Sequence, residues 1–327
     1  MNVKPRIVVT QRIAEEALDL LREAGAVGFC LEPDQPPSAA DLLSAVRDAD
    51  AMLCMLTDNI DKGVLEAGSR LLVVANMAVG YNNIDIGAAT ARRIPVTNTP
   101  GILTETTADL AWALLLAVAR RVVEGDRLVK AGQFKGWQPM LLLGGDVHGK
   151  TLGVVGMGRI GTAVARRARG FGMTVVYHAR HRIALEVEAE APARRVSLEA
   201  LLRSSDFVSI HAPYSSETHH LIGAKELAMM KPSAYLVNTS RGPLVDETAL
   251  VEALKEGRLA GAALDVFEHE PELAPGLAGL LNVVLTPHIG SASRETRTRM
   301  AIMAAGNIVA ALQGKRPPNL VNPEVYP

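Results

Sequence analysis

The sequence predicts an α/β protein built from two doubly wound parallel sheets, and two observations support this fold class. Short apolar runs of strand type alternate with stretches of helical periodicity in both halves of the chain. Such alternation is typical of a parallel sheet that is covered by helices on both faces. The length of 327 residues, 48% of them hydrophobic, is sufficient for two domains that each have a core of their own.

The first unit ends near Gly101 and starts with a strand that leads directly into a helix. Prolines at positions 33, 36 and 37 predict a loop, and Ser38 with Asp41 three residues later forms a capping-box pattern that predicts a helix start. Helices are expected at residues 13–24, 38–49 and from 61 onward. Strands are expected at residues 6–10, 27–31, 51–56, 71–75 and 94–97.

The second unit opens with a long helix from Thr104, for which Thr104 and Thr107 are candidate caps. Its apolar stretch at residues 110–119 is too short to span a bilayer, and a loop follows at residues 132–149. The last helix, residues 295–313, is expected to pack back on the first unit. Strands are expected at residues 152–155, 174–177, 207–211, 234–238, 261–265 and 283–286.

A glycine-rich turn, Gly156-Met157-Gly158-Arg159-Ile160-Gly161, lies between the strand at 152–155 and a predicted helix. The first glycine allows a backbone conformation that a side chain would resist, the second lets the main chain approach a pyrophosphate, and the third lets helix and strand pack closely. The free N–H groups at the helix start then face the phosphates. This context predicts dinucleotide binding, whereas an isolated pattern of this kind is often an ordinary turn.

Three polar residues follow three successive strands of the second unit. Arg241 lies in Asn-Thr-Ser-Arg-Gly-Pro, Glu270 in Asp-Val-Phe-Glu-His-Glu-Pro, and His288 in Thr-Pro-His-Ile-Gly-Ser. Separately, each residue is more often a solvated or structural side chain than a catalytic one. Ligands of open parallel sheets bind at the carboxyl ends of the strands, so the three side chains are expected to converge on one crevice.

Together these motifs resemble the D-isomer-specific 2-hydroxyacid dehydrogenases over essentially the whole chain, and most closely their glyoxylate/hydroxypyruvate reductases. The segment Val79-Gly80-Tyr81-Asn82-Asn83-Ile84-Asp85 also matches the family. The resemblance implies a Rossmann domain at residues 101–290, inserted in a flavodoxin-like substrate domain at residues 1–100 and 291–327. It also implies an active site between the two domains.

The resemblance assigns a role to each polar residue. Arg241 would bind the carboxylate and carbonyl of a small 2-oxo acid with its planar fork, and the main-chain N–H groups of Ala78, Val79 and Gly80 would hold the carboxylate from the other side. His288 would donate a proton to the carbonyl oxygen during hydride transfer, and Glu270 would favour the charged imidazolium. The family therefore implies reduction of glyoxylate to glycolate and of hydroxypyruvate to D-glycerate.

The cofactor is expected to be NADP, with NAD as the open alternative. Ala179 stands at the end of the second strand, where NAD-specific members would have an acid, and Arg180 with Arg182 can meet a 2′-phosphate. The alternative is a solvated basic loop in an enzyme that accepts both cofactors. Asp265, by resemblance, would face the carboxamide, although it could simply terminate a strand. The residues assigned to the cofactor by resemblance are Thr104, Gly156, Gly158, Arg159, Ile160, Gly161, Ala179, Arg180, His181, Arg182, His211, Ala212, Pro213, Thr239, Ser240, Arg241, Asp265, His288 and Gly290.

Trp137 lies in the loop before the glycine turn, and in similar enzymes this loop crosses a dimer interface and closes the partner's pocket. The resemblance therefore implies a homodimer formed through the dinucleotide-binding domain. A bulky ring there would favour small substrates, although Trp137 could equally serve interface packing alone. The segment Gly136–Pro139 also resembles phosphite dehydrogenases of the same family, but those have a lysine where this chain has Val79.

Composition limits the remaining possibilities. The 34 basic and 35 acidic side chains give a net charge of −1, which argues against nucleic acid or an anionic membrane as the main partner. Two cysteines, Cys30 and Cys54, do not make a disulfide framework, so a reducing cytoplasm is expected, and no metal site is predicted. A corepressor or another dinucleotide sensor with the same fold is the alternative from a different functional class.

Overall fold

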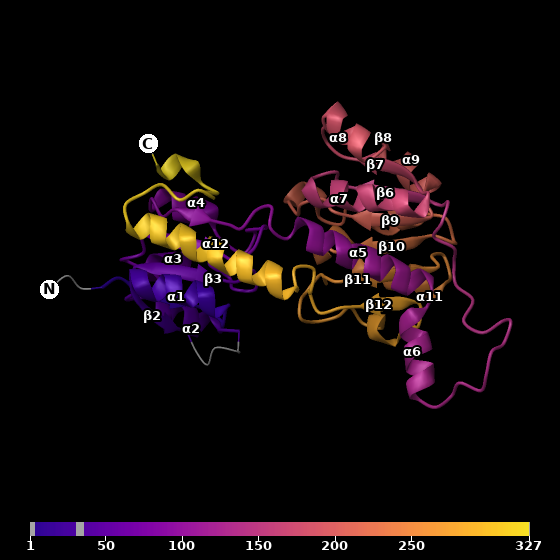
Figure 1. Cartoon of the computed structure of the whole chain (residues 1–327), viewed down its shortest axis with the longest axis horizontal. Helices are drawn as coiled ribbons and strands as arrows, with labels where there is room; N and C mark the ends of the chain where they lie inside the picture. Colours follow the sequence, from indigo (N-terminus) through magenta and orange to yellow (C-terminus); the bar gives the residue numbers. More distant parts are fainter. Residues whose placement is uncertain (1–3, 31–35, 327) are drawn as a thin grey trace. The chain divides into compact units, whose positions relative to one another are not determined.

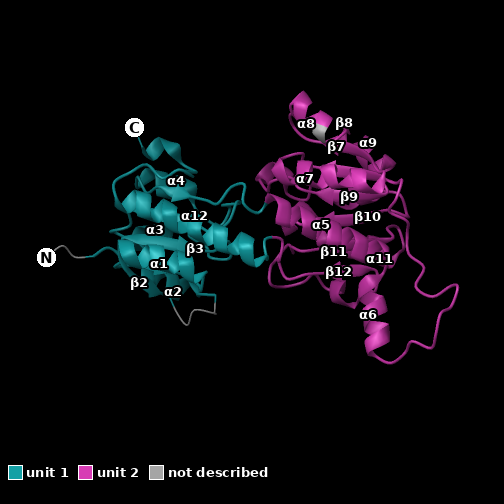
Figure 2. Ribbon diagram, viewed as in Figure 1, with its two compact units in different colours: residues 1–103, 291–327 teal, residues 104–290 magenta. Residues whose placement is uncertain are grey.

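The computed structural model describes residues 4–30 and 36–326, so the predicted loop at Pro33 lies outside the described part. The chain divides into two compact units (Figure 2). Unit 1 comprises residues 1–103 and 291–327, and unit 2 comprises residues 104–290. The chain therefore passes between the units at Leu103–Thr104 and again at Gly290–Ser291.

Unit 1 contains a five-stranded parallel sheet in the order β2-β1-β3-β4-β5, which is the flavodoxin-like order. Its strands are β1 (Arg6–Val9), β2 (Ala26–Phe29), β3 (Ala51–Cys54), β4 (Val73–Asn76) and β5 (Val96–Thr97). Its helices are α1 (Glu15–Ala24), α2 (Ala39–Val46), α3 (Lys62–Ala67), α4 (Ile86–Ala91) and α12 (Arg294–Leu312). The capping box at Ser38 and Asp41 starts α2 as predicted.

The C-terminal helix α12 packs on the N-terminal helix α1, although almost the whole chain separates the two in sequence (Figure 1). Ala301, Ala304 and Ile308 of α12 share one buried cluster with Leu18 of α1 and Val9 of β1. The other face of the sheet is covered by a second cluster that includes residues of α2 and α3. The prediction that the last helix returns to the first unit is confirmed.

Unit 2 contains a seven-stranded parallel sheet in the order β12-β11-β10-β9-β6-β7-β8. Six of the strands were predicted, and the seventh, β8, was missed because its three residues include two exposed arginines and no apolar run. The strands are β6 (Thr151–Val155), β7 (Thr174–His178), β8 (Ala193–Arg195), β9 (Phe207–Ile210), β10 (Tyr235–Asn238), β11 (Gly261–Leu264) and β12 (Val283–Leu285). Two doubly wound parallel sheets thus confirm the predicted fold class.

Helices cover both faces of the unit 2 sheet. One face packs on α5 (Thr104–Ala119) and α7 (Arg159–Ala168), and the other packs on α9 (Leu198–Ser204) and α11 (Glu247–Lys255). The remaining helices of the unit are α6 (Val122–Lys130), α8 (Leu185–Glu190) and α10 (Ala224–Leu227). Short 3-10 turns of this unit occur at Arg169–Phe171, Ser216–Thr218, Gly242–Leu244 and Leu277–Gly279, and a further one, Pro323–Val325, belongs to unit 1.

The long helix predicted from Thr104 ends at Ala119, and α6 follows it as a separate helix. Arg121 between them has a φ of 52°, in the left-handed region, which breaks the helical path. Its guanidinium makes a two-bond ion pair with Glu124, with Nε to Oε1 at 2.9 Å and Nη2 to Oε2 at 2.7 Å. Residues 131–149 then form a long excursion without regular structure beside α6 (Figure 1).

Candidate active site

Glu270 and His288, which follow adjacent strands, are in direct contact. His288 Nδ1 lies 2.9 Å from Glu270 Oε2, and the other carboxylate oxygen accepts a hydrogen bond of 3.0 Å from Phe267 N. The side chain of His288 is 24% exposed and that of Glu270 is 28% exposed, so both are partly accessible to a ligand. Glu270 thus orients the imidazole through Nδ1, and this leaves Nε2 as the ring nitrogen that can exchange a proton with a ligand.

The charges around Glu270 keep it ionised. Burial raises the pKa of this carboxyl, but the hydrogen bond and charge of His288, the Phe267 N–H and the charge of Arg241 together hold the pKa below its usual value. Burial lowers the pKa of Arg241 and the charge of Glu270 opposes this change, so the guanidinium keeps its charge. The structure therefore brings the three predicted side chains into one electrostatic group within unit 2.

Arg241 lies at the carboxyl end of β10 in a backbone turn that Asn238 fixes. Asn238 Nδ2 donates to the Arg241 carbonyl at 2.9 Å, and Asn238 Oδ1 accepts from Ser240 N at 3.0 Å. The next residue must be glycine, since a Cβ on Gly242 would lie 1.9 Å from the carbonyl carbon and oxygen of Phe267. This close approach joins the Arg241 turn to the segment that carries Glu270.

His288 has a φ of 53°, an unfavourable conformation for a residue with a β-carbon. Asp265, only 1% exposed, holds this turn in place. Its Oδ1 accepts from Thr286 Oγ1 at 2.6 Å and from Ile289 N at 2.8 Å, and its Oδ2 accepts from Gly290 N at 2.7 Å. Burial raises the pKa of Asp265, and these donors only partly offset the rise. Asp265 therefore holds the turn that carries His288.

The three glycines of the turn differ in the space that surrounds them. Gly156 has a φ of 93°, and a Cβ there would meet Ala212 N at 2.4 Å. A Cβ on Gly161 would lie 2.1 Å from the Gly156 oxygen, whereas one on Gly158 would meet nothing within 4 Å. Gly158 starts α7 without a side-chain cap, so the first N–H groups of this helix remain available for an anion. The three glycines have the steric environments that a dinucleotide site requires.

Other residues predicted to contact the cofactor lie at the carboxyl ends of β9 and β10. Ser240 Oγ donates to the Ala212 carbonyl at 2.6 Å, which ties the two strand ends together. Thr239 Oγ1 is buried and has no hydrogen-bond partner among the described residues. Burial lowers the pKa of His211 to about 4, and its Nε2 lies 2.8 Å from Ser209 Oγ. An unsatisfied buried hydroxyl in this position is consistent with a ligand.

The end of β7 differs from the sequence prediction in one respect. Arg182 was expected to be available to a phosphate, but it makes a two-bond ion pair with Glu188, with Nε to Oε1 at 3.0 Å and Nη2 to Oε2 at 2.8 Å. The side chain of Arg180 is 69% exposed, and its ion pair with Glu217 is long, at 3.6 Å. The sequence did not indicate Glu188 as the partner of Arg182, because Glu188 is one of several glutamates in the same short helix.

In unit 1, the loop after β4 presents the predicted substrate donors. The carbonyls of Ala78, Val79 and Gly80 accept hydrogen bonds from Thr99 N, Asn98 Nδ2 and Asn76 Nδ2 respectively, at 2.8 to 2.9 Å. Within the described chain, no residue accepts a hydrogen bond from the N–H groups of these three residues. No sequence pattern indicated the two asparagines, which hold the loop with its donors unpaired.

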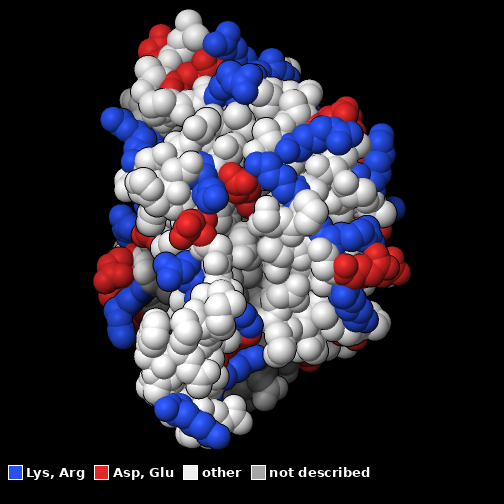
Figure 3. Space-filling view, turned by 90° about the vertical axis from the view of Figure 1, so that its right-hand side faces the viewer, with Lys and Arg blue, Asp and Glu red and all other residues white. Residues whose placement is uncertain are grey.

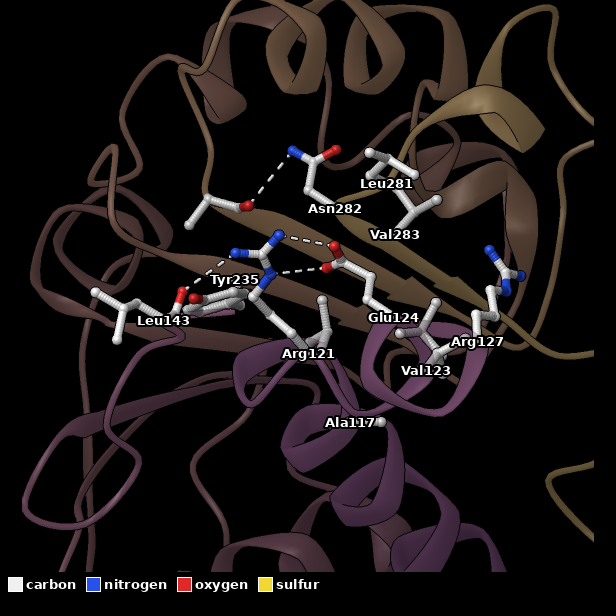
Figure 4. Close-up of a pocket in the computed structure, with 13 residues that line it drawn as sticks. Ala117, Arg121, Val123, Glu124, Arg127, Leu143, Tyr235, Leu281, Asn282 and Val283 are labelled. Carbon is white, nitrogen blue, oxygen red and sulfur yellow. Dashed lines mark hydrogen bonds and ion pairs between the residues drawn. The ribbon is translucent and has the colours of Figure 1, made fainter. Parts of the chain in front are cut away.

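A surface pocket of about 190 Å³ lies elsewhere on unit 2, where α5 meets α6 (Figure 4). Arg121 and Glu124, which both line it, form an ion pair, and Arg121 Nη1 donates to the Leu143 carbonyl at 3.5 Å. None of the three predicted catalytic residues lines this pocket. Trp137, which was predicted to contact substrate, lies on the 131–149 excursion and is 83% exposed.

One group of three side chains in the described residues has the composition of a metal site, namely His219, His220 and Glu268. His220 Nε2 lies 2.6 Å from Glu268 Oε1, and the His219 ring stacks on His220 with centroids 4.0 Å apart. The Glu268 main-chain N–H also donates to Glu247 Oε1 at 2.8 Å. These contacts anchor the segment before Glu270.

Comparison with known proteins identifies the family. A sequence profile described as D-isomer specific 2-hydroxyacid dehydrogenase, NAD binding domain, matches residues 112–290. A glyoxylate reductase of Thermococcus litoralis is 51% identical, with 99% of this chain and 98% of the relative covered. The chain belongs to the D-isomer-specific 2-hydroxyacid dehydrogenases. A glyoxylate reductase of Korarchaeum cryptofilum is 54% identical, over 99% of this chain and 97% of the relative.

Solved structures of 2-hydroxyacid dehydrogenases and related proteins share the fold. A protein of Thermus thermophilus superimposes with a TM-score of 0.90 at 50% identity, over 97% of this chain and 99% of that chain. An NADPH-dependent glyoxylate/hydroxypyruvate reductase of Sinorhizobium meliloti, solved with NADP and malonate, has a TM-score of 0.86 at 33% identity, over 99% and 98% of the two chains. The predicted family resemblance is confirmed. No helix in the described ranges is long and apolar enough to cross a bilayer.

Proposed function

We propose that this 2-hydroxyacid dehydrogenase reduces small 2-oxo acids, glyoxylate and hydroxypyruvate in particular, with NADPH as the preferred donor and NADH as a possible one. The observation that carries the proposal is the His288–Glu270 pair beside Arg241, at the carboxyl edge of a sheet whose glycine turn fits a pyrophosphate. The names of the relatives, which are glyoxylate reductases at about half identity over the full length, support the same substrate class.

When bound, the nicotinamide ring supplies the hydride that reaches the carbonyl carbon. Arg241 binds the carboxylate and carbonyl oxygens with two parallel donors, which lysine cannot provide. His288 donates the proton from Nε2 to the carbonyl oxygen, and Glu270 stabilises the imidazolium through Nδ1. The unpaired N–H groups of Ala78, Val79 and Gly80 are proposed as further carboxylate ligands. In the oxidative direction, His288 accepts the proton.

The test follows nicotinamide absorbance while the full-length protein is mixed with NADPH or NADH and a panel of 2-oxo acids. Wild-type protein should consume NADPH with glyoxylate and hydroxypyruvate. His288→Gln should lose about a hundredfold or more of kcat while it still binds NADPH, because it lacks the proton donor. The control is His148→Gln, an exposed histidine outside the site, which should behave like wild type. Unchanged turnover in His288→Gln would remove this residue as the acid.

The same assay decides between the remaining alternatives. A corepressor or dinucleotide sensor would bind NADPH with negligible turnover of every 2-oxo acid in the panel. A phosphite dehydrogenase would reduce NAD with phosphite, but Val79 offers no cation for a dianionic substrate. We therefore expect no phosphite-dependent reduction, and a Val79→Lys variant provides the comparison.

We also propose that the protein forms a homodimer through unit 2. Apolar side chains on α6 and the 131–149 excursion are exposed, and no element in the described part of the chain covers them. Large parts of the molecular face that carries them lack charged side chains (Figure 3). The exposed fractions are 55% for Val122, 59% for Val129, 53% for Phe134, 83% for Trp137, 76% for Met140 and 57% for Leu143. Exposed apolar patches of this kind are typical of interfaces between subunits.

Light scattering on the purified protein tests this assembly. Wild type should have the mass of a dimer, and Met140→Asp with Leu143→Asp should shift it toward a monomer. Trp137→Ala truncates a single side chain of this patch, so the protein should remain mostly dimeric, while loss of the ring proposed to close the partner's pocket should alter the KM ratio between glyoxylate and larger 2-oxo acids. A cytoplasmic location is part of the proposal, and it fits the two free cysteines.

A further inference from the structure

The segment after β7 contains an ion pair that the reaction does not use. Arg182 places two guanidinium nitrogens on the two oxygens of Glu188, at 3.0 and 2.8 Å. This fork geometry uses the same parallel donors that an arginine offers to a phosphate group. While the pair is intact, the Nε/Nη2 edge of Arg182 is occupied and the charge of the guanidinium is compensated, so that only the N–H groups outside this edge can reach a second anion.

Glu188 is held rigidly in this arrangement. Its side chain is only 13% exposed, whereas that of Arg182 is 61% exposed. Oε1 also accepts a hydrogen bond of 2.5 Å from the hydroxyl of Tyr177, a residue of β7 that is fully buried. The donors Arg182 and Tyr177 hold the pKa of Glu188 at about 2, so the carboxylate is ionised at every pH at which the protein would be assayed. Tyr177 thus fixes the position of Glu188, and Arg182 pairs with this fixed carboxylate.

Arg180 is in a different situation. Arg195 Nη2 donates to the carbonyls of Ala179 and Arg180, both at 2.9 Å, and so fixes the backbone that follows β7. The Arg180 side chain itself is 69% exposed, and its contact with the 76% exposed Glu217 is 3.6 Å long. Exposed pairs of this length contribute little, so Arg180 is available to an anion in a way that Arg182 is not.

We propose that Glu188 is a specificity-determining residue: it sequesters Arg182 and adds a negative charge beside the 2′-phosphate position, so that recognition of a 2′-phosphorylated adenosine depends on Arg180. This inference rests on the proposed use of NADPH, and it means that Glu188 limits the preference of the protein for NADPH over NADH. Removing the acid releases a second arginine and removes a repelling charge at the same time. The preference for NADPH should therefore increase when Glu188 is neutralised.

Titration calorimetry on the full-length protein with 2′,5′-ADP and with 5′-AMP tests the inference without any catalytic step. Glu188→Gln should bind 2′,5′-ADP about tenfold more tightly and 5′-AMP as wild type does, in line with one added charged hydrogen-bonding partner. The matched control is Glu186→Gln, which removes the same charge from an exposed position of the same helix. It should leave both affinities unchanged.

Arginine variants separate sequestration from simple charge. Arg182→Gln alone leaves the Glu188 charge unpaired and should weaken 2′,5′-ADP binding only a few fold, whereas Arg180→Gln should weaken it about tenfold or more. In the double variant Glu188→Gln with Arg182→Gln, most of the gain from Glu188→Gln should disappear. This non-additivity is a readout that a merely structural role of Glu188 would not produce.

Two results would overturn the inference. One is equal loss of 2′,5′-ADP affinity in Arg182→Gln and Arg180→Gln, which would mean that Arg182 already binds the phosphate. The other is a Glu188→Gln variant with no gain. The arginine variants keep the test decisive if Glu188→Gln fails to fold. Failure of the proposed function is seen separately, as absent turnover of 2-oxo acids in a protein that still binds these nucleotides with the predicted pattern.

Discussion

The same glycine-to-alanine change should lower the stability of the fold at one position of the glycine turn, Gly161, and the affinity for NADPH at another, Gly158. At Gly161 the new Cβ would lie 2.1 Å from the Gly156 oxygen, far inside any normal contact, so α7 and the turn must move apart. Overpacking of this kind costs about 1–3 kcal/mol of unfolding free energy. At about 2–4 °C per kcal/mol for a unit of this size, Gly161→Ala should unfold several degrees below wild type.

At Gly158 the new Cβ would meet nothing within 4 Å, and φ there is −78°, which alanine adopts without strain. The fold should therefore lose less than about 1 kcal/mol, the usual difference between glycine and alanine at a helix cap. The methyl group would occupy the space into which a pyrophosphate must approach the main chain. Loss of one or two charged hydrogen bonds, at about 1.5–3 kcal/mol each, predicts a tenfold or greater rise in the Kd for NADPH.

Thermal unfolding and calorimetric titration with NADPH measure the two effects independently. Gly170→Ala is the matched control, because its Cβ would also meet open space but lies outside the turn. It should retain wild-type affinity. A Gly158→Ala variant that binds NADPH as tightly as wild type would refute the assignment of this turn to the pyrophosphate.

Three further predictions follow from the site. Arg241→Lys should raise the KM for glyoxylate about tenfold or more and lower kcat in steady-state assays, since lysine lacks the planar fork; unchanged values of both would exclude the clamp. Asp265→Asn should loosen the turn that carries His288, and should therefore lower kcat at least tenfold and reduce the free energy of unfolding in denaturant by about 1–3 kcal/mol. The control is Asp246→Asn, at a helix cap that asparagine serves equally well, and it should have neither effect. Burial lowers the pKa of His211 to about 4 in the folded protein, below the ordinary 6.5, so its contribution to the free energy of unfolding is complete above pH 6.5 and is lost as the pH falls toward 4. Over that range the unfolding free energy of wild type should fall by about 3 kcal/mol more than that of His211→Gln. Parallel pH profiles of the two proteins would argue against a buried neutral imidazole.

Sequence patterns predicted most of the architecture because most strands of both sheets are short apolar runs. The elements that escaped prediction lack such a signal. Strand β8 has two exposed arginines. The break between α5 and α6 depends on the left-handed backbone of Arg121, and the sequence there contains no glycine or asparagine that would indicate such a conformation. Local pattern cannot anticipate such features, since pairing to β7 and packing around the helix break determine them.

The polar site residues and the pairing of Glu270 with His288 were predictable from motifs at strand ends, whereas the contacts that hold the surrounding turns were not. Arg241, Glu270 and His288 each follow an apolar run in a recognisable motif. The contacts that position the site residues have no such pattern in the sequence. Examples are the hydrogen bonds by which Asp265 holds the turn of His288, and the ion pair between Glu188 and Arg182. Only the fold determines which carboxylate faces which arginine, and for that reason Arg182 was taken as available when it is paired.

The return of α12 to the N-terminal sheet has a consequence for how the protein is made. The apolar face formed by α1, β1 and β3 emerges first from the ribosome, but the residues that cover it, Ala301 to Ile308, are synthesised almost last. Unit 2 is contiguous and can acquire its core during translation. Unit 1 must wait for the end of the message, and during that interval its incomplete layer is the part of the nascent protein that a chaperone would be expected to shield.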